Sequence, residues 1–436
     1  MSYKLGDKIL VDLVDGSKVQ GMFVPSNDDN FLLIKLYSGY NRNIIKKKIK
    51  NIKLILEHKE KMKTQDQIMQ NENLPLIYIL HVGGTIASKV DYTTGGVSAQ
   101  IDSSELIDSI PEIKNLARIK TKVLMNMMSE NIRFEHFNIF AKDIINLLED
   151  EKIDGIILFH GTDTLHYTSC ALSFILQNIK IPVILVGSQR SSDRPSSDST
   201  MNLLCAIKFI VDQKTNDKNL TGFFACMHGN SNDDYCNIFR SINLRKMHTS
   251  RRDAFKQINS MPIAEVHNDK IKYFELCNTD DISPLFEPAY FRNDIKVGIL
   301  KSHPNMFSEE FAAYKNYDGL ILEATGLGHI PLIYDDKITK ENKNIEQELK
   351  NLCKEMPIVV TSQCINGSTN LNVYAPGRKL MGLGVLEAGA IITETVFIKL
   401  AWLLSNFSKK EIKELWKRNF VGEILSRDLY EKTSDE

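Results

Sequence analysis

The first part of the chain alternates apolar and polar positions in short segments. Turn-forming residues such as Asp15-Gly16 and Pro25 separate these segments. A period of two residues predicts strands that bury one face, and several short strands divided by turns are typical of a small β-barrel. The pattern therefore predicts a small β-barrel domain over residues 1–57, with strands at 8–14, 18–24, 30–36 and 48–55.

A polar stretch at 58–73 has no sustained apolar face and is expected to be a linker or a short exposed helix. From residue 76 onward, short apolar strands alternate with longer helical stretches, which is typical of α/β domains with parallel sheets. The expected strands lie at 76–81, 155–159, 182–186, 222–226, 296–300, 319–323 and 358–361. We therefore expect a two-domain α/β body, 74–290 and 291–436, with a charged helical tail from Lys409.

Two strand-and-turn runs within this body resemble each other. One runs from Asp154 to Thr162 and the other from Asp318 to Gly326, and both begin Asp-Gly before an apolar strand. Such a match is what two related α/β halves would give.

Composition limits the classes of function. The 436 residues are 43% hydrophobic and 25% charged with a formal net charge of −1, so there is no overall attraction to nucleic acid or to an acidic membrane. No apolar run approaches the ~18–20 residues of a membrane span, and the N-terminus lacks the apolar core of a secretory signal. The seven cysteines form no C-x-x-C pair, and the ten histidines show no H-x-x-x-H spacing. These observations predict a cytoplasmic protein with reduced thiols and no metal site.

Two glycine–threonine turns carry the candidate chemistry. Gly83-Gly84-Thr85 follows the first α/β strand, and His160-Gly161-Thr162-Asp163-Thr164 follows the second. Taken singly, the first is an ordinary loop and the second an ordinary helix N-cap. The carboxyl ends of parallel strands, however, lie at the edge of the sheet where such folds bind ligands. Together the turns predict two hydroxyl groups at one site.

These two turns resemble the two signatures of the bacterial-type L-asparaginase family, and the resemblance covers roughly residues 76–400. Further strings at 187–198, 245–255 and 325–329 are similar to one branch, the archaeal Glu-tRNA(Gln) amidotransferase D subunits. That branch also carries a small β-barrel ahead of an asparaginase-like body. The resemblance implies an amidohydrolase that releases ammonia from glutamine.

The family pattern also implies roles for individual residues. Thr85 would attack the amide carbon and form an acyl-enzyme, helped by Tyr92. Thr162, Asp163 and Lys246 match a second catalytic group, in which a desolvated lysine can act as a base. The residues alone leave open which threonine attacks first, and spacing alone would make Lys246 part of a solvated basic loop.

The same resemblance implies how the amino-acid head of the substrate is held. Asp163 would bind the α-ammonium group and Ser129 the α-carboxylate, with Glu130 also facing the head. In isolation Ser129 would be an ordinary N-cap. Backbone N–H groups of the two turns would form the oxyanion hole.

The implied assembly is a glutaminase subunit that feeds ammonia to a kinase partner subunit of the E type. The partner would use ATP and Mg to convert Glu-tRNA(Gln) to Gln-tRNA(Gln), and this chain would need no cofactor. We expect a homodimer core within a heterotetramer. The alternatives are a free-standing asparaginase or glutaminase, and a scaffold that has kept the fold but lost turnover.

The segment 42–63 is locally basic, with nine Lys or Arg against two Glu. Lysines commonly protect exposed strand edges, and that is the simpler interpretation. The alternative is contact with tRNA phosphates.

Overall fold

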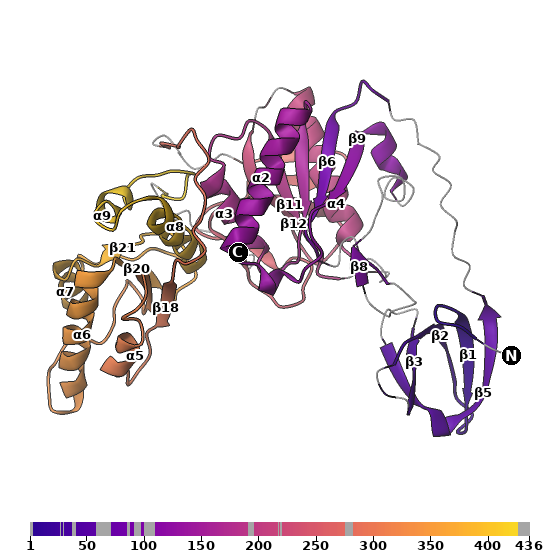
Figure 1. Cartoon of the computed structure of the whole chain (residues 1–436), viewed down its shortest axis with the longest axis horizontal. Coiled ribbons are helices and arrows are strands. Elements are labelled where there is room, and N and C mark those ends of the chain that lie inside the picture. The colour runs from indigo at the N-terminus through magenta and orange to yellow at the C-terminus, as the bar shows by residue number, and fades with distance from the viewer. Residues whose placement is uncertain are drawn as a thin grey trace.

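Three bodies follow one another along the chain (Figure 1). A small β-barrel lies at one end, a large α/β domain in the middle and a smaller α/β domain at the other end. This arrangement confirms the predicted mixed α/β fold with an N-terminal β-rich part. The computed structural model describes residues 3–26, 28, 30–36, 41–57, 71–84, 88–90, 97–99, 110–190, 196–216, 218, 220–274 and 282–425.

The barrel is a five-stranded antiparallel sheet in the order β4-β3-β2-β1-β5. Its strands are β1 (Lys8–Leu13), β2 (Lys18–Val24), β3 (Phe31–Lys35), β4 (Asn41–Ile45) and β5 (Ile49–Leu56). A 3-10 turn, η1 (Lys46–Lys48), joins the two outer strands. Alternate positions are buried, as in β1, where Ile9 and Val11 have no exposed surface. The sequence analysis missed β4, because its first residues are polar and only Ile44 reaches the core.

The large domain is built on an eight-stranded sheet in the order β17-β16-β13-β12-β11-β10-β6-β9. Strands β9, β6, β10, β11 and β12 pair in parallel, and three antiparallel strands extend the sheet beyond β12. The bounds are β6 (Leu76–His81), β9 (Arg118–Val123), β10 (Gly155–Phe159), β11 (Pro182–Val186), β12 (Gly222–His228), β13 (Tyr235–Arg240), β16 (Ala264–His267) and β17 (Ile271–Tyr273).

Helices cover both faces of this sheet. Helices α2 (Phe134–Asp150) and α3 (Leu165–Ile175) share a core with Leu80 and Leu158 on one face. On the other face, α4 (Ser199–Thr215) packs on the intervening strand residues. Shorter elements complete the domain: β7 (Ser88–Val90), β8 (Val97–Ala99), η3 (Pro111–Asn115), η4 (Ser129–Asn131), β14 (Leu244–Lys246) and β15 (Phe255–Gln257).

The small domain has a four-stranded parallel sheet in the order β18-β19-β20-β21. Helix α8 (Thr393–Asn406) lies between the two α/β domains and belongs to the same apolar core as α2 and α3, so one core holds both domains together. The elements are β18 (Val297–Lys301), α5 (Ser308–Ala312), β19 (Gly319–Ala324), η5 (Ile338–Lys340), α6 (Glu341–Glu355), β20 (Ile358–Ser362), α7 (Ala375–Gly382), β21 (Leu386–Glu387), α8 (Thr393–Asn406) and α9 (Ile412–Leu415).

The two similar Asp-Gly runs occupy equivalent positions in their sheets. The Asp154 carboxylate accepts the backbone N–H of Leu76 at 2.9 Å, and the Asp318 carboxylate accepts that of Lys296 at 2.9 Å. In each case the aspartate N–H also donates to the carbonyl of the same neighbour. The glycines that follow, at 155 and 319, each leave room for a covering helix side chain. The sequence match therefore corresponds to a shared structural feature: in both runs an aspartate at the start of the strand makes two hydrogen bonds to the backbone of a residue at or just before the neighbouring strand.

Only a short part of the predicted helical tail is helical among the tail residues that the structure describes. Helix α9 ends at Leu415, and residues 416–425 fold as a loop. Glu423 lies in this loop, fully buried, and its carboxylate is 2.7 Å from the ammonium group of buried Lys399. The pair fixes the loop against α8. Within the described residues, no helix is long and apolar enough to cross a membrane.

Candidate active site

The turns that follow β6 and β10 meet at the carboxyl edge of the large sheet. The two strands are parallel neighbours, with His81 opposite Phe159. Gly84 has a positive φ of 88°, and a Cβ atom there would lie 2.7 Å from the backbone nitrogen of Gly161. Only glycine allows this approach. The first predicted turn therefore begins in direct contact with the second.

A third segment, around η4, closes on the same point. A Cβ atom on Gly161 would lie 2.9 Å from both the Cβ and the Oγ of Ser129, so the Gly161 backbone packs on the Ser129 side chain. Thr164 donates a hydrogen bond of 2.6 Å from its hydroxyl to the Ser129 carbonyl. Ser129 is buried, whereas Glu130 beside it is exposed. The predicted head-binding serine thus lies against the threonine turn.

Lys246 reaches this turn from strand β14. Its ammonium group donates hydrogen bonds to the Thr162 hydroxyl at 2.9 Å and to the Asp163 carboxylate at 2.8 Å. The lysine side chain is only 11% exposed, while the Asp163 side chain is 65% exposed. A mostly buried amine therefore contacts the Thr162 hydroxyl, with an accessible carboxylate at its side.

Three buried histidines surround the site and are neutral near pH 7. Burial lowers the pKa of His81 and of His160 to about 4 each, and that of His166 to about 3. His160 donates from Nδ1 to the Gly161 carbonyl at 2.6 Å, so its Nε2 accepts from the Thr168 hydroxyl at 2.8 Å. These rings shape the turn. The basic group in contact with Thr162 is Lys246.

Thr85 and Tyr92, predicted as nucleophile and helper, lie outside the described residues. Of the other predicted site residues, the structure brings together Ser129, Thr162, Asp163 and Lys246. No group of three or more His, Cys, Asp or Glu suited to a metal ion occurs among the residues that the structure describes.

Several neighbours of the site were not singled out by the sequence analysis. A Cβ atom at Gly187 would lie 2.8 Å from the Thr162 methyl group, so the chain after β11 packs on this threonine. Arg245 pairs with the mostly buried Glu394 of α8 at 3.3 Å, and desolvation raises the pKa of that carboxyl. The strings at 187–198 and 245–255 contain Gly187 and Arg245, but no spacing rule gave them a role.

Comparison with known proteins identifies the family. The model of the N-terminal asparaginase domain matches residues 76–277, and that of the glutaminase/asparaginase C-terminal domain matches 296–416. The Methanococcus maripaludis protein named as the D subunit of glutamyl-tRNA(Gln) amidotransferase is 39% identical over 428 residues, which are 96% of this chain and 98% of that relative. The chain belongs to the family of glutamyl-tRNA(Gln) amidotransferase D subunits. The resemblance inferred from the sequence motifs is confirmed.

Other relatives agree. D subunits from Thermococcus kodakarensis and Archaeoglobus fulgidus are 40% and 36% identical, and each alignment covers at least 96% of this chain and 94% of the relative. Among solved structures, the thermostable L-asparaginase from T. kodakarensis superposes with a TM-score of 0.69 at 29% identity. It matches 80% of this chain and 99% of its own. The D subunits therefore align with nearly the whole chain, whereas the asparaginase structure aligns with 80% of it.

A second asparaginase has the same fold. The probable cytoplasmic L-asparaginase from Campylobacter jejuni superposes with a TM-score of 0.62 at 26% identity, covering 79% of this chain and 99% of its own.

Proposed function

We propose that this chain is the glutaminase subunit of a tRNA-dependent amidotransferase: a glutamine amidohydrolase whose ammonia serves as the amido donor for Gln-tRNA(Gln). The observation that carries the proposal is the contact of Lys246 with Thr162 and Asp163 at the meeting point of the two turns. Membership of the D-subunit family supports the choice of glutamine and of a tRNA-linked product.

In this mechanism Thr85 attacks the amide carbon of glutamine, with Tyr92 helping to remove its proton. The C–N bond breaks, ammonia leaves with a transferred proton, and an ester links the glutamyl group to Thr85. Water then attacks the ester and releases glutamate. Thr162 accepts a proton from this water as its own hydroxyl proton passes to Lys246 in its uncharged form, since the 2.9 Å separation of the two side chains is within the range for proton transfer.

The amino-acid head binds beside this pair. The exposed Asp163 carboxylate accepts a hydrogen bond from Lys246 and has open surface for the α-ammonium group. Ser129 binds the α-carboxylate from the segment packed on Gly161, with Glu130 at the open side. Backbone N–H groups of the turns receive the oxyanion, where loss of one donor typically costs ~10²–10³ in rate.

The assembly follows from the product. Ammonia is protonated in bulk water, so we propose that it passes through a channel to an E-type kinase partner. That partner activates the γ-carboxyl of Glu-tRNA(Gln) with ATP and Mg in the cytoplasm. This chain itself needs no cofactor, and two copies form the core of a heterotetramer.

Ammonia release tests the proposal. The full chain is assayed with glutamine and with asparagine, each with and without the partner subunit and Glu-tRNA(Gln). We expect glutamine to be preferred and its hydrolysis to rise when partner and tRNA are present. Asparagine hydrolysis that is faster and independent of both would establish the alternative, a free-standing asparaginase.

Two isosteric variants assign the nucleophile. With partner and tRNA present, Thr85→Val should abolish ammonia release, because no hydroxyl remains to form the ester. Thr162→Val should lower the rate by ~10²–10⁴, the usual contribution of general acid–base help. Full activity of Thr85→Val would instead assign the attack to another residue, and Thr162 would then be the first to consider.

A further inference from the structure

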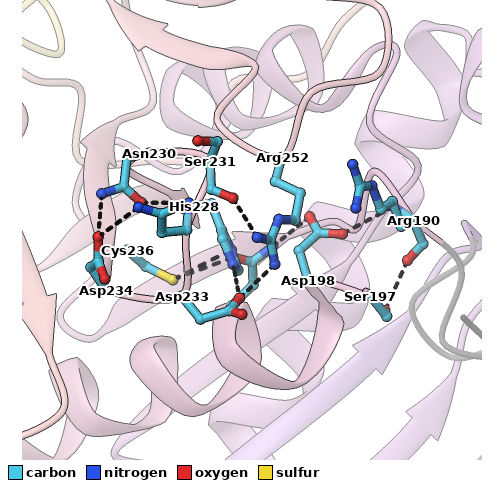
Figure 2. A network of polar contacts seen from close by, with 12 residues as sticks. Arg190, Ser197, Asp198, His228, Asn230, Ser231, Asp233, Asp234, Cys236 and Arg252 are labelled. Carbon is cyan, nitrogen blue, oxygen red and sulfur yellow. Dashed lines mark hydrogen bonds and ion pairs between the residues drawn. The ribbon is translucent and has the colours of Figure 1, made fainter. Parts of the chain in front are cut away.

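A path of polar contacts connects the hairpin that carries Lys246 with the chain beside Thr162 (Figure 2). The hairpin consists of β14, β15 and the tip between them. Its base is held by Gln257, whose side chain accepts from the Arg240 N–H at 2.8 Å and donates to the Ile242 carbonyl at 2.6 Å. The path begins at the tip.

Arg252 is the anchor of the tip. Its guanidinium group donates to the Asp233 carboxylate at 2.5 Å and to the Ser231 carbonyl, both in the turn between β12 and β13. The side chain of Arg252 is only 12% exposed, although it lies in a loop. Figure 2 shows Arg252 and His228 converging on Asp233. The two groups come from different elements, so Asp233 joins the hairpin to the end of β12.

His228 continues the path into the core. This ring has no exposed surface, and its Nδ1 lies 2.6 Å from the Asn202 side-chain oxygen. The Asn202 nitrogen donates to the Gly187 carbonyl at 3.0 Å and to Asp198 at 3.1 Å, which fixes the orientation of the amide. The Asn202 oxygen is therefore the acceptor, and Nδ1 of His228 carries a proton.

The opposite nitrogen of His228, Nε2, lies 3.2 Å from Asp233 and donates to it only when the ring is positively charged. Burial lowers the pKa of His228, and the nearby Arg252 acts in the same direction, while Asp233 and Asp198 oppose this. Buried Cys236 also faces the ring, with its sulfur 3.9 Å from Nδ1. Arg252 is charged throughout, so its hold on Asp233 does not depend on the state of the histidine.

The far end of the path reaches Thr162. Asn202 holds the Gly187 carbonyl, and Gly187 packs on the Thr162 methyl group. The adjacent Gln189 and Arg190 N–H groups both donate to the buried Asp198 carboxylate at 3.0 Å. One end of the path thus lies on the Lys246 hairpin and the other against Thr162.

We propose that Arg252 is a positioning residue for amide hydrolysis: with Asp233 it holds the Lys246 hairpin at the distance from Thr162 that proton transfer requires. This inference rests on the proposed function of Lys246. A displacement of about 1 Å in a catalytic group can cost ~10² in rate, so a loosened tip would be visible in kcat.

The chain supplies a matched control for each partner. Arg251 is the neighbouring arginine of the same tip, but it pairs with Asp253, two residues away, at 2.9 and 2.8 Å. Asp234 is the neighbouring aspartate of the same turn, but it accepts from Asn230 within that turn at 2.7 Å. These contacts are local and join no separate elements.

The experiment compares steady-state glutamine hydrolysis, with the partner subunit and Glu-tRNA(Gln) present, for Arg252→Gln, Arg252→Lys and Arg251→Gln. We expect Arg252→Gln to lower kcat by about 10- to 100-fold, the range set by such misplacement, with KM changed much less. Arg252→Lys keeps the charge and should recover part of the loss. Lys246→Met should remove one limb of the kcat–pH profile. In Arg252→Gln the same limb should remain but lie at a different pH. Arg251→Gln should behave as wild type.

A second arm measures coupling. Asp233→Asn should resemble Arg252→Gln, the double variant should be no worse than either, and Asp234→Asn should have little effect. If Arg252→Gln fails to fold, Asp233→Asn carries the same comparison. Equal kcat for Arg252→Gln and Arg251→Gln, or additive losses in the double variant, would overturn the inference. Full activity of Lys246→Met would instead refute the proposed role of Lys246.

Discussion

The buried ion pair between Lys399 and Glu423 should be one of the most sensitive points for stability. Both side chains are fully buried. The Lys399 ammonium group donates to Glu423 at 2.7 Å and to the carbonyls of Trp416 and Arg418 at 2.9 Å each, so all three of its N–H bonds are used. Glu423 accepts in turn from the N–H groups of Phe420 and Val421.

Lys399→Met removes the cation and leaves a carboxylate in the core. Breaking a buried pair in this way costs about 3–5 kcal/mol. At about 2 °C per kcal/mol for a domain of this size, the unfolding midpoint should fall by roughly 6–10 °C. Lys399→Met with Glu423→Gln removes both charges and should recover much of the loss.

Differential scanning calorimetry measures this directly. The matched control is Lys315→Met, because Lys315 also pairs with a glutamate, Glu348, at 3.0 Å but is 59% exposed. Exposed pairs contribute little, so its midpoint should stay close to that of wild type. A Lys399→Met midpoint equal to that of Lys315→Met would refute this account of the tail.

Three further predictions concern the site and the barrel. Gly84→Ala places a methyl group against Gly161 at a positive φ, so glutamine hydrolysis should fall sharply while the control Gly382→Ala, where space is open, stays active; equal activities would contradict the contact between the turns. The pKa of His160 is about 4 in the folded protein and near 6.5 in the unfolded chain, so the unfolded chain binds the proton first as pH drops from 6.5 to 4. The free energy of unfolding, measured by urea denaturation, should therefore fall over this range, and it should fall less in His160→Gln. An equal fall in both proteins would contradict this prediction. If the exposed lysines of η1 contact tRNA phosphates, changing residues 46–48 to Glu should weaken tRNA binding and flatten its salt dependence; unchanged affinity and slope would leave edge protection as their role.

Local patterns predicted much of the fold. The buried strands β6, β10 and β11 were predicted to the residue, because each is a largely apolar run bounded by Pro, Gly or polar residues. β4 was missed, because its polar start reads as a continuation of the preceding loop. The tail was predicted as a helix because it is rich in charged residues. Most of it is a loop, because Glu423 pairs with buried Lys399, and no local pattern reveals that contact.

The site itself could be predicted only in part. Lys246 lies 84 residues from Thr162 in sequence, and only the family resemblance connected them. The path through Asn202, His228 and Asp233 joins separate elements by side chains whose spacing follows no known rule. Contacts of this kind depend on how the sheet and its loops pack, which one sequence does not encode locally.

The most direct test of the central claim is glutamine hydrolysis by Lys246→Met, compared with Lys256→Met on the opposite strand of the same hairpin. With partner subunit and Glu-tRNA(Gln) present, Lys246→Met should lose ~10²–10⁴ of the rate of ammonia release, while Lys256→Met retains it. Equal rates in the two variants would contradict the claim that amide hydrolysis takes place at the Lys246–Thr162 pair.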